Sequence, residues 1–210
     1  MFGIQEKELK ILKRLNTPKK IQAFLDAMPK NFEEKGCTVY SPMTVLQKRK
    51  CHCVEGAVLA ALALRLSGQE PLLLDLTATE DDYDHVIALY RKYGKWGAIS
   101  KTNYAVLRFR EPVYNSVREL AMSYFHEYLV DGGKKTLRSF SGPMNLKKFD
   151  KHGWMTTMEE IDYVSEHLAK VKHYQIMNRQ QIQNLRKADK IEVKAGMLVE
   201  WSRGKKQKNF

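Results

Sequence analysis

The segment CVEGAVLAALALRL, Cys53–Leu66, places apolar side chains on nearly every face of a helix and is rich in alanine. An amphipathic surface helix has one apolar stripe, whereas a helix that is apolar all round is buried. Gly68 follows, at a position where glycine commonly ends a helix in the left-handed conformation. We therefore predict a central helix over residues 53–66, packed on several sides by the rest of the chain.

The segments that follow this helix have the pattern of β-strands. Pro71–Leu76 (PLLLDL) predicts a buried strand, and an acidic loop separates it from His85–Tyr90 (HVIALY). Trp96–Ser100 (WGAIS) comes next, and the turn at Gly94 predicts that the two form an antiparallel hairpin. Tyr104–Phe109 (YAVLRF) is predicted to extend the sheet. A buried helix beside antiparallel strands indicates an α+β fold.

Helical and hairpin patterns flank this region on both sides. On the N-terminal side they predict two helices within residues 1–40, the second capped by Thr17-Pro18. On the C-terminal side they predict a helix opened by Glu111-Pro112 and then an irregular stretch up to Trp154. A helix capped by the box Thr156–Glu159 and a hairpin over residues 190–201 are predicted to follow. We expect a single domain over residues 1–210, with its core at 40–130 and a basic C-terminal extension at 134–210.

The composition of the 210 residues is that of a globular protein, with 43% hydrophobic and 29% charged residues. It excludes disordered and collagen-like chains. Three cysteines, two of them separated by one residue, do not suit a disulfide framework, and the N-terminus lacks the pattern of a signal peptide. The longest apolar run falls short of the roughly 20 residues that a membrane span needs. We expect a cytoplasmic protein with no membrane partner.

One segment contains a residue suited to catalysis as well as to packing, because Cys53 falls in the first turn of the predicted central helix. Unpaired backbone N–H groups and the positive end of the helix dipole favour a thiolate there, and the same N–H groups can hold an oxyanion. A thiol nucleophile also needs a base. His85, at the head of a strand, is the candidate, and Ser100 and Asn103 are the candidates for the acceptor that fixes its imidazole.

These residues resemble the core of the bacterial transglutaminase-like superfamily. The resemblance is carried by Cys53-x-x-x-Ala57 with Arg65 and Gly68, Pro71 opening a strand, His85-VIALY, the hairpin, and Trp96-GAI. It covers residues 51 to about 104 and implies a papain-like α+β core. Members of the superfamily include transglutaminases, cysteine peptidases and peptide N-glycanases, together with relatives that have lost activity.

The resemblance assigns Cys53 to the nucleophile position and His85 to the base position, while Cys51 matches nothing. The family usually has an Asp after the Trp of the next strand, and this chain has Ser100 there. Because Asn orients the imidazole in papain-like sites, we expect Asn103, rather than Ser100, to be the acceptor. The implied function is a cysteine hydrolase or acyltransferase acting on a peptide, amide or small-molecule acyl substrate, with no cofactor. His85 would take the thiol proton and return it to the leaving amine.

A different class of function stays open, because the usual carboxylate is missing. A catalytically inactive binding or scaffold protein on the same fold would contact an acidic partner or nucleic acid through residues 134–210, which hold 17 of the 36 Lys and Arg but only 8 of the 24 Asp and Glu residues. No RNA- or DNA-recognition motif accompanies this basicity. Cys51, His52 and Cys53 offer zinc ligands, but the second ligand pair of a structural zinc site is missing.

Further polar residues have structural explanations at this stage. We interpret Glu55 as a helix cap, with general-acid catalysis as the alternative. We interpret His52 as a neighbour directed away from the thiol, with an imidazole that helps to hold the thiol ionised as the alternative. The acidic loop residues Glu80, Asp81, Asp82 and Asp84 are interpreted as a solvated loop, with steering of a substrate amine or orientation of His85 as the alternatives. Arg108, Arg110 and Glu111 predict an ion-pair network, with binding of a substrate carboxylate as the alternative.

Overall fold

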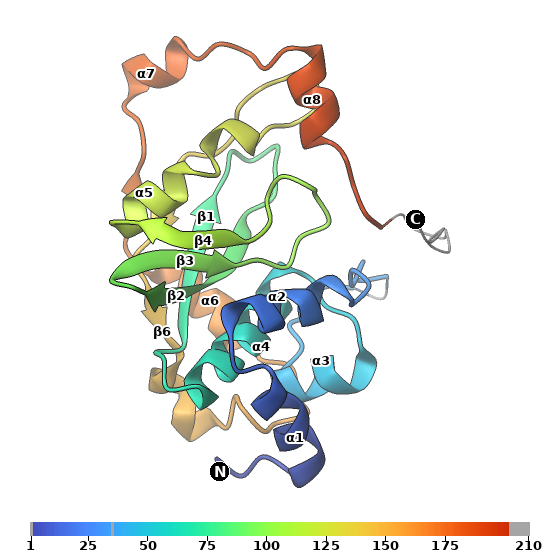
Figure 1. Ribbon diagram of the computed structural model, residues 1–210. Helices are drawn as coiled ribbons and strands as arrows, with labels where there is room; N and C mark the ends of the chain where they lie inside the picture. Colours follow the sequence, from blue (N-terminus) through green and yellow to red (C-terminus); the bar gives the residue numbers. More distant parts are fainter. Residues whose placement is uncertain (1, 35, 202–210) are drawn as a thin grey trace.

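The computed structural model describes residues 2–34 and 36–201. Its strands form one sheet, and helices lie on both sides of it (Figure 1). The α-helices are α1 (Glu6–Arg14), α2 (Pro18–Asp26), α3 (Pro42–Lys48), α4 (Cys53–Leu66), α5 (Val117–Met122), α6 (Asp162–Lys170), α7 (Arg179–Gln183) and α8 (Lys190–Gly196). Two 3-10 helices are η1 (Phe125–Glu127) and η2 (Leu146–His152).

The sheet is antiparallel throughout its described pairings. Its strands are β1 (Leu72–Thr77), β2 (His85–Lys92), β3 (Lys95–Ile99), β4 (Arg110–Tyr114), β5 (Ser139–Ser141), β6 (Met144–Asn145) and β7 (His173–Gln175). The order across the sheet is β4-β3-β2-β1-β5-β7, and β6 pairs with β1. Tyr93 and Gly94 both have positive φ at the β2–β3 turn, as a two-residue hairpin turn of the favoured hand requires.

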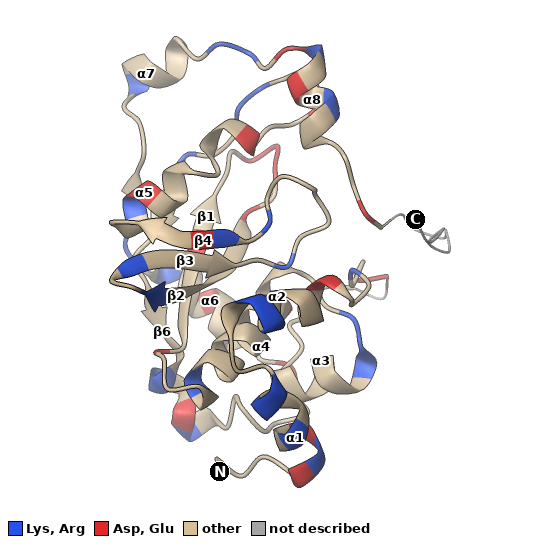
Figure 2. Ribbon diagram, viewed as in Figure 1, with Lys and Arg blue, Asp and Glu red and all other residues tan. Residues whose placement is uncertain are grey.

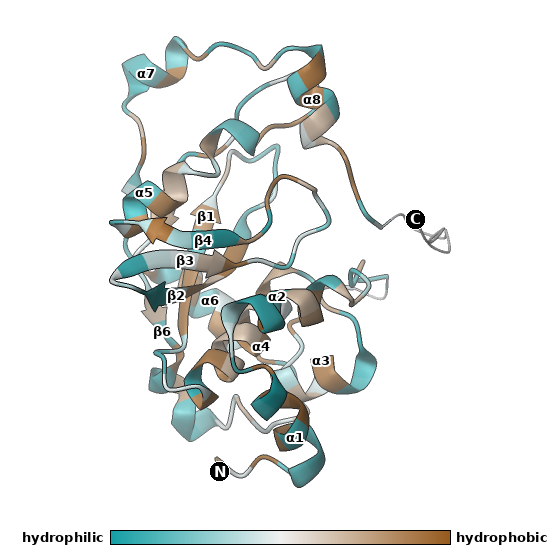
Figure 3. Cartoon of the chain, viewed as in Figure 1, coloured by the Kyte–Doolittle hydropathy of each residue, from teal (hydrophilic) through white to brown (hydrophobic). Residues whose placement is uncertain are grey.

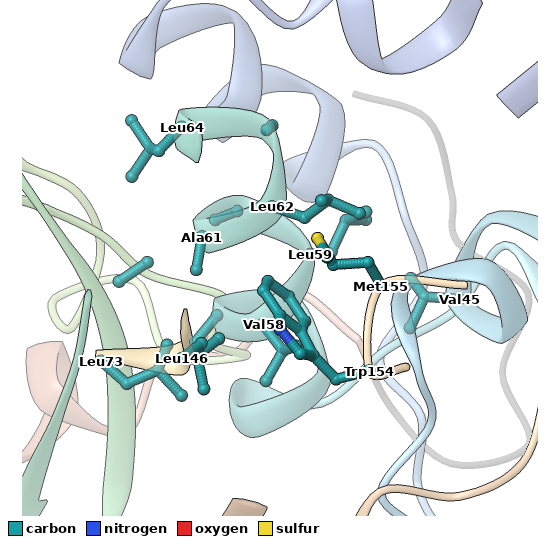
Figure 4. Packing of buried hydrophobic residues seen from close by; sticks show 14 of the residues in the cluster. Val45, Val58, Leu59, Ala61, Leu62, Leu64, Leu73, Leu146, Trp154 and Met155 are labelled. Carbon is teal, nitrogen blue, oxygen red and sulfur yellow. The ribbon is translucent and has the colours of Figure 1, made fainter. Parts of the chain in front are cut away.

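Helix α4 lies at the centre of the larger core, as its sequence predicts. Its residues 57–64 are all buried, and it packs against β2 and the N-terminal helices. Figure 4 shows Val58 and Leu62 among side chains from elsewhere in the chain, including Leu146 and Trp154. The hydrophobic α4 contrasts with the hydrophilic α7 (Figure 3). The predicted end of the helix is also confirmed, because Gly68 has a φ of +84°.

The sheet separates two hydrophobic cores. Leu73, Val86 and Ala88 belong to the core that contains α4, whereas Leu74 and Ile87 belong to a second core beneath α5. Successive side chains of a strand point to opposite faces of its sheet. Because both faces are covered, β1 and β2 are apolar without alternation, as their sequences showed.

The region after the hairpin corrects two predictions. Residues 104–109 do not form a strand, and Glu111-Pro112, predicted to open a helix, lies in β4 instead. Proline lacks a backbone N–H, but β4 is the edge strand of the sheet, where this loss is tolerated. The following helix begins only at Val117, where the Ser116 side chain accepts from the N–H of Glu119 at 3.1 Å.

The C-terminal third differs from its prediction in three places. The stretch expected to be irregular contains β5, β6 and η2. Helix α6 begins at Asp162 rather than at the Thr156–Glu159 box, because α3 holds that segment: Thr44 Oγ1 donates to Met158 O at 2.9 Å. Residues 190–196 form α8 instead of a hairpin strand, because the Asp189 side chain caps the helix in a capping box with Glu192.

Candidate active site

Cys53 is the first residue of α4, and the segment before it is fixed to the loop that follows α2. The N–H of Cys51 donates to Pro29 O at 3.2 Å, and the N–H of Asn31 donates to Cys51 O at 3.1 Å. His52 then caps the helix in an extended conformation. The Cys53 thiol therefore lies at the positive end of α4, where unpaired N–H groups favour an anion.

The first turn of α4 is stabilised by Glu55, whose side chain is buried with 0% exposure. Its carboxylate accepts hydrogen bonds from four residues: His52 N at 2.8 Å, Asn31 Nδ2 at 3.2 Å, Thr38 Oγ1 at 3.0 Å and Tyr40 N at 3.1 Å. The sequence-based interpretation of Glu55 as a cap is confirmed by the bond to His52 N. The other bonds tie the loop before α3 to the start of α4.

His85 is the first residue of β2, and its buried imidazole faces Ser100, which directly follows β3. His85 Nε2 lies 2.7 Å from Ser100 Oγ, and Ser100 Oγ donates to Leu107 O at 2.6 Å. A hydroxyl has one proton to donate. Because Leu107 O takes it, Ser100 accepts the bond from a protonated His85 Nε2, and the neutral imidazole keeps its lone pair on Nδ1.

Ser100 is itself fixed by α2. The buried Gln22 side chain donates from Nε2 to Ser100 O at 2.9 Å and accepts from Ser100 N at 3.0 Å. These two bonds fix the position of Ser100 relative to His85. Sequence analysis did not identify Gln22, although a polar residue next to Ile21 on the apolar side of a predicted helix was a signal for it.

The electrostatics at α4 favour an ionised thiol. Burial raises the pKa of Cys53, but interactions with the side chains of His52 and His85 outweigh it and bring the pKa well below its ordinary value. Burial lowers the pKa of His52, whereas Cys53, Glu55 and the Thr38 carbonyl raise it, with a net rise to about 9. The interpretation of His52 as a residue directed away from the thiol is therefore wrong.

A cavity of about 290 Å³ opens over Cys53, a residue that is partly exposed. Its lining includes His52, Cys53, His85, Tyr83, Tyr104 and Tyr128. The Tyr128 hydroxyl donates to the carbonyl of Tyr83, so the loop before β2 is held against the chain that follows α5. The nucleophile candidate and both imidazoles thus share one space that is large enough for a small acyl group or an extended side chain.

Asn103 does not have the role that was expected of it. Its Nδ2 donates to Trp201 O and its Oδ1 accepts from Trp201 N, both at 2.8 Å. The side chain lines the same cavity, but its polar atoms hold the C-terminal segment rather than His85. The contact with the imidazole comes from Ser100, because Ser100 follows β3 directly and lies beside the neighbouring strand β2.

Cys51 is part of the hydrophobic core, although it also contributes to the lining of the cavity. Its thiol is buried with 0% exposure, and burial raises its pKa to about 12. Lys101 packs closely against Gly56 in the same region, where an added Cβ would lie 2.5 Å from Lys101 Cβ. The Lys101 ammonium donates to Leu25 O at 2.9 Å and to Met28 O at 2.5 Å. Cys37 is exposed, so Cys53 alone combines a low pKa with access to the cavity.

The carboxylates of the acidic loop before β2 bond both to the loop's own backbone and to Lys134 and Thr136. Asp81 pairs with Lys134 at 2.7 Å, and Asp84 accepts from the N–H of Ala78 at 2.8 Å. No carboxylate of this loop hydrogen-bonds His85 in the described part of the chain. The same residues 2–34 and 36–201 contain no cluster of His, Cys, Asp and Glu suited to a metal ion.

The arginines after β3 form ion pairs, as the structural interpretation predicts. Arg108 lies 2.6 Å from a Glu200 carboxylate oxygen and 3.7 Å from one of Asp26. Arg110 pairs with Glu127. The described basic residues of the C-terminal third lie in η2, α6, α7 and α8 and in the segments before and between them; Figure 2 marks those of α7 and α8 in blue. The basic run at 203–208 lies outside the described residues.

The role of His52 beside the thiol was only the alternative interpretation of the sequence, and the supports of its imidazole were not predicted. The available signal was Cys51-His52-Cys53-Val54-Glu55, in which a histidine precedes the helix and a glutamate follows it three positions later, at the spacing of a capping box. Asn31 gave no such signal, because only the tertiary structure brings it to Glu55.

Two further observations concern the whole chain. Among the described residues, no helix combines the length and the apolar character needed to cross a membrane. No protein-family model matches the sequence, and neither does any curated protein.

Proposed function

We propose that this protein is a cysteine-dependent hydrolase or acyltransferase that acts on amide or ester carbonyls, with Cys53 as its nucleophile. The observation that carries the proposal is the placement of a low-pKa thiol at the start of α4, in an open cavity, beside an imidazole held by Ser100 at 2.7 Å. A low pKa and access to solvent are the properties that distinguish reactive cysteines from structural ones.

The chemistry follows from this geometry. Cys53 Sγ attacks the carbonyl carbon, and the N–H groups at the first turn of α4 stabilise the oxyanion. Loss of an amine or alcohol leaves a thioester on Cys53, which water or an amine then resolves. His85 transfers the protons, with Nδ1 as its free nitrogen. None of these steps draws on a cofactor.

We further propose that the fold is a transglutaminase-like core. Three features of the chain support this: a cysteine at the start of the central helix α4, a histidine at the head of β2, and its acceptor directly after β3. The departure from the family lies in the acceptor, because Ser100 offers a neutral hydroxyl where a carboxylate is usual. A hydroxyl stabilises an imidazolium less than a carboxylate does.

The test is formation of an acyl-enzyme with an activated ester such as p-nitrophenyl acetate. Intact-mass and peptide mass spectrometry should find the acyl group on Cys53, with none in Cys53→Ser. Cys37→Ser is the matched control, because it removes an exposed thiol outside the cavity and should leave acylation unchanged. Acylation that is absent, or equally fast on Cys37, would overturn the proposal and favour the binding-protein alternative.

A further inference from the structure

The Cys53 thiol interacts with two imidazoles, and among the described residues only that of His52 has a carboxylate partner. His52 Nε2 is 2.7 Å from Thr38 O and 3.3 Å from Glu55 Oε1. A carbonyl oxygen only accepts hydrogen bonds, so His52 Nε2 carries a proton and Nδ1 is the nitrogen left for the thiol. A second carboxylate, that of Glu33, lies 3.9 Å from the same Nε2.

The surroundings of His85 are different. Its Nε2 donates to the neutral hydroxyl of Ser100, and no carboxylate forms an ion pair with it within residues 2–34 and 36–201. A buried charge is stabilised by an opposite charge or by strong hydrogen bonds to its charged form. The environment of His52 therefore supplies carboxylates that stabilise an imidazolium, whereas that of His85 supplies only a neutral hydroxyl.

We propose that His52, held by Glu55 and the Thr38 carbonyl, is the positioning residue that keeps Cys53 as a thiolate, while His85 is needed chiefly to resolve the acyl-enzyme. Only the role of His85 in resolving the acyl-enzyme rests on the proposed function. The carboxylate that is missing beside His85 is thus supplied beside the other histidine. The direction of both pKa shifts, up for His52 and down for Cys53, agrees with such a pair.

With an ester substrate, each proton transfer can be assigned to a residue or to the leaving group. In acylation, the bond from Cys53 Sγ to the carbonyl carbon forms and the C–O bond breaks; p-nitrophenolate leaves as an anion, so no protein proton is consumed. In deacylation, a water oxygen bonds to the carbonyl carbon, its proton passes to His85 Nδ1, and the C–S bond breaks. The thiolate returns to its pair with His52, and His85 releases its proton to solvent.

The decisive measurement is the pH dependence of iodoacetamide alkylation at Cys53, followed by mass spectrometry in the full chain. His52→Gln keeps a donor for the Thr38 carbonyl but cannot carry a charge. We expect it to raise the apparent pKa of Cys53 toward the ordinary ~8.5 and to slow alkylation at about pH 6.5 by roughly 10- to 100-fold. His85→Ala should raise the pKa of Cys53 by less than His52→Gln does, because the imidazole held by Glu55 remains. His152→Gln, which changes an exposed histidine outside the cavity, should leave the pKa of Cys53 unchanged.

The opposite pattern, with an ordinary pKa in His85→Ala and a depressed one in His52→Gln, would overturn the inference. A second measurement covers the case in which His52→Gln does not fold. NMR titration of the imidazoles should show the pKa of His52 falling from about 9 in Cys53→Ser, because the thiolate is gone. An unchanged His52 pKa would also overturn the pairing.

Turnover separates this inference from the proposed function. With p-nitrophenyl acetate, His85→Ala should release one equivalent of p-nitrophenolate per protein and then stop, leaving the acyl group on Cys53. Steady turnover in His85→Ala would overturn the assignment of His85 to deacylation. A wild-type protein that shows the predicted alkylation profile but never acylates would instead refute the proposed function and leave the His52–Cys53 pair standing.

Discussion

At the scale of single residues, Glu55 has the densest set of partners near the site. Removing a buried acceptor leaves its donors without partners, and each such donor costs more than a hydrogen bond contributes. Asn31, Tyr40 and the backbone of His52 all donate to this carboxylate. Stability and reactivity therefore depend on the same side chain, because Glu55 both fixes the loop and lies beside the imidazole of His52.

We expect Glu55→Ala to lower the free energy of unfolding by about 3 kcal/mol or more, since several buried donors lose their acceptor. Urea denaturation followed by circular dichroism measures the change. Glu159→Ala, at an exposed glutamate, is the control and should shift the free energy by less than about 0.5 kcal/mol. Equal effects of the two substitutions would show that the buried network does not stabilise the fold.

At the scale of elements, a buried carboxylate of β1 contacts a histidine of β7 on the other side of β5. Asp75 Oδ2 lies 3.2 Å from His173 Nε2, while His173 Nδ1 lies 2.6 Å from Val171 O and must donate to it. Asp75 Oδ1 is buried without a hydrogen-bond partner among the described residues. Burial, together with Asp84, raises the pKa of Asp75 despite the contact with His173. The ionised form therefore destabilises the folded protein.

Asp75→Asn should accordingly stabilise the protein, by about 1 kcal/mol near pH 8. The asparagine Nδ2 can donate to His173 Nε2, because the proton that His173 donates to Val171 O lies on Nδ1. Because the folded pKa of Asp75 is raised, its destabilising effect is full above that pKa and absent below the unfolded value of about 3.9. The gain should therefore shrink as pH falls. Urea unfolding at several pH values measures it, and a gain that grows toward acid pH would contradict this account.

The C-terminal segment after α8 is a second element whose role can be tested. Asn103 binds both backbone groups of Trp201, and Arg108 pairs with Glu200. Asn103→Ala should destabilise this attachment by about 1–2 kcal/mol and speed proteolysis after α8. The pH profile of Cys53 alkylation should stay that of the wild type. A loss of the low Cys53 pKa in this variant would restore Asn103 to the catalytic role that the sequence suggested.

At the scale of the whole molecule, β1 and β2 connect the two cores, because neighbouring residues of one strand face opposite sides. Leu73 and Leu74 are both fully buried, one in each core. A protein with two hydrophobic cores unfolds in one cooperative step only if the sheet between them couples the stability of one core to that of the other. The site lies where this coupling matters, since Cys53 starts a helix of one core and His85 starts a strand that serves both.

We expect Leu73→Ala and Leu74→Ala each to cost about 2–5 kcal/mol and to leave a single cooperative transition. Tryptophan fluorescence and far-ultraviolet circular dichroism should give coincident unfolding curves in urea. The fluorescence has a reporter in each core, Trp154 in the first and Trp96 at the second. Curves that separate in either variant would show that the two cores unfold independently.

Local signals allowed much of this fold to be predicted. Helix α4 begins and ends where its apolar run and Gly68 place it, and the β2–β3 hairpin follows from its strand pattern and Gly94. These elements depend on side-chain periodicity and on backbone conformations that few residues adopt. The placement of a cysteine at the start of a buried helix was likewise a property of the sequence itself.

Other features were decided by contacts between distant residues. Pro112 is compatible with a helix start or an edge strand, and only its neighbour β3 selects the strand. Ser100 and Asn103 are three positions apart, yet the path of the chain to Leu107 directs one to His85 and the other to Trp201. His52 acquires its place beside the thiol through Thr38 and Glu55. Local patterns were therefore enough to identify the nucleophile candidate and the elements that carry it, whereas tertiary packing set its hydrogen-bond partners, because those bonds join residues that no local pattern relates.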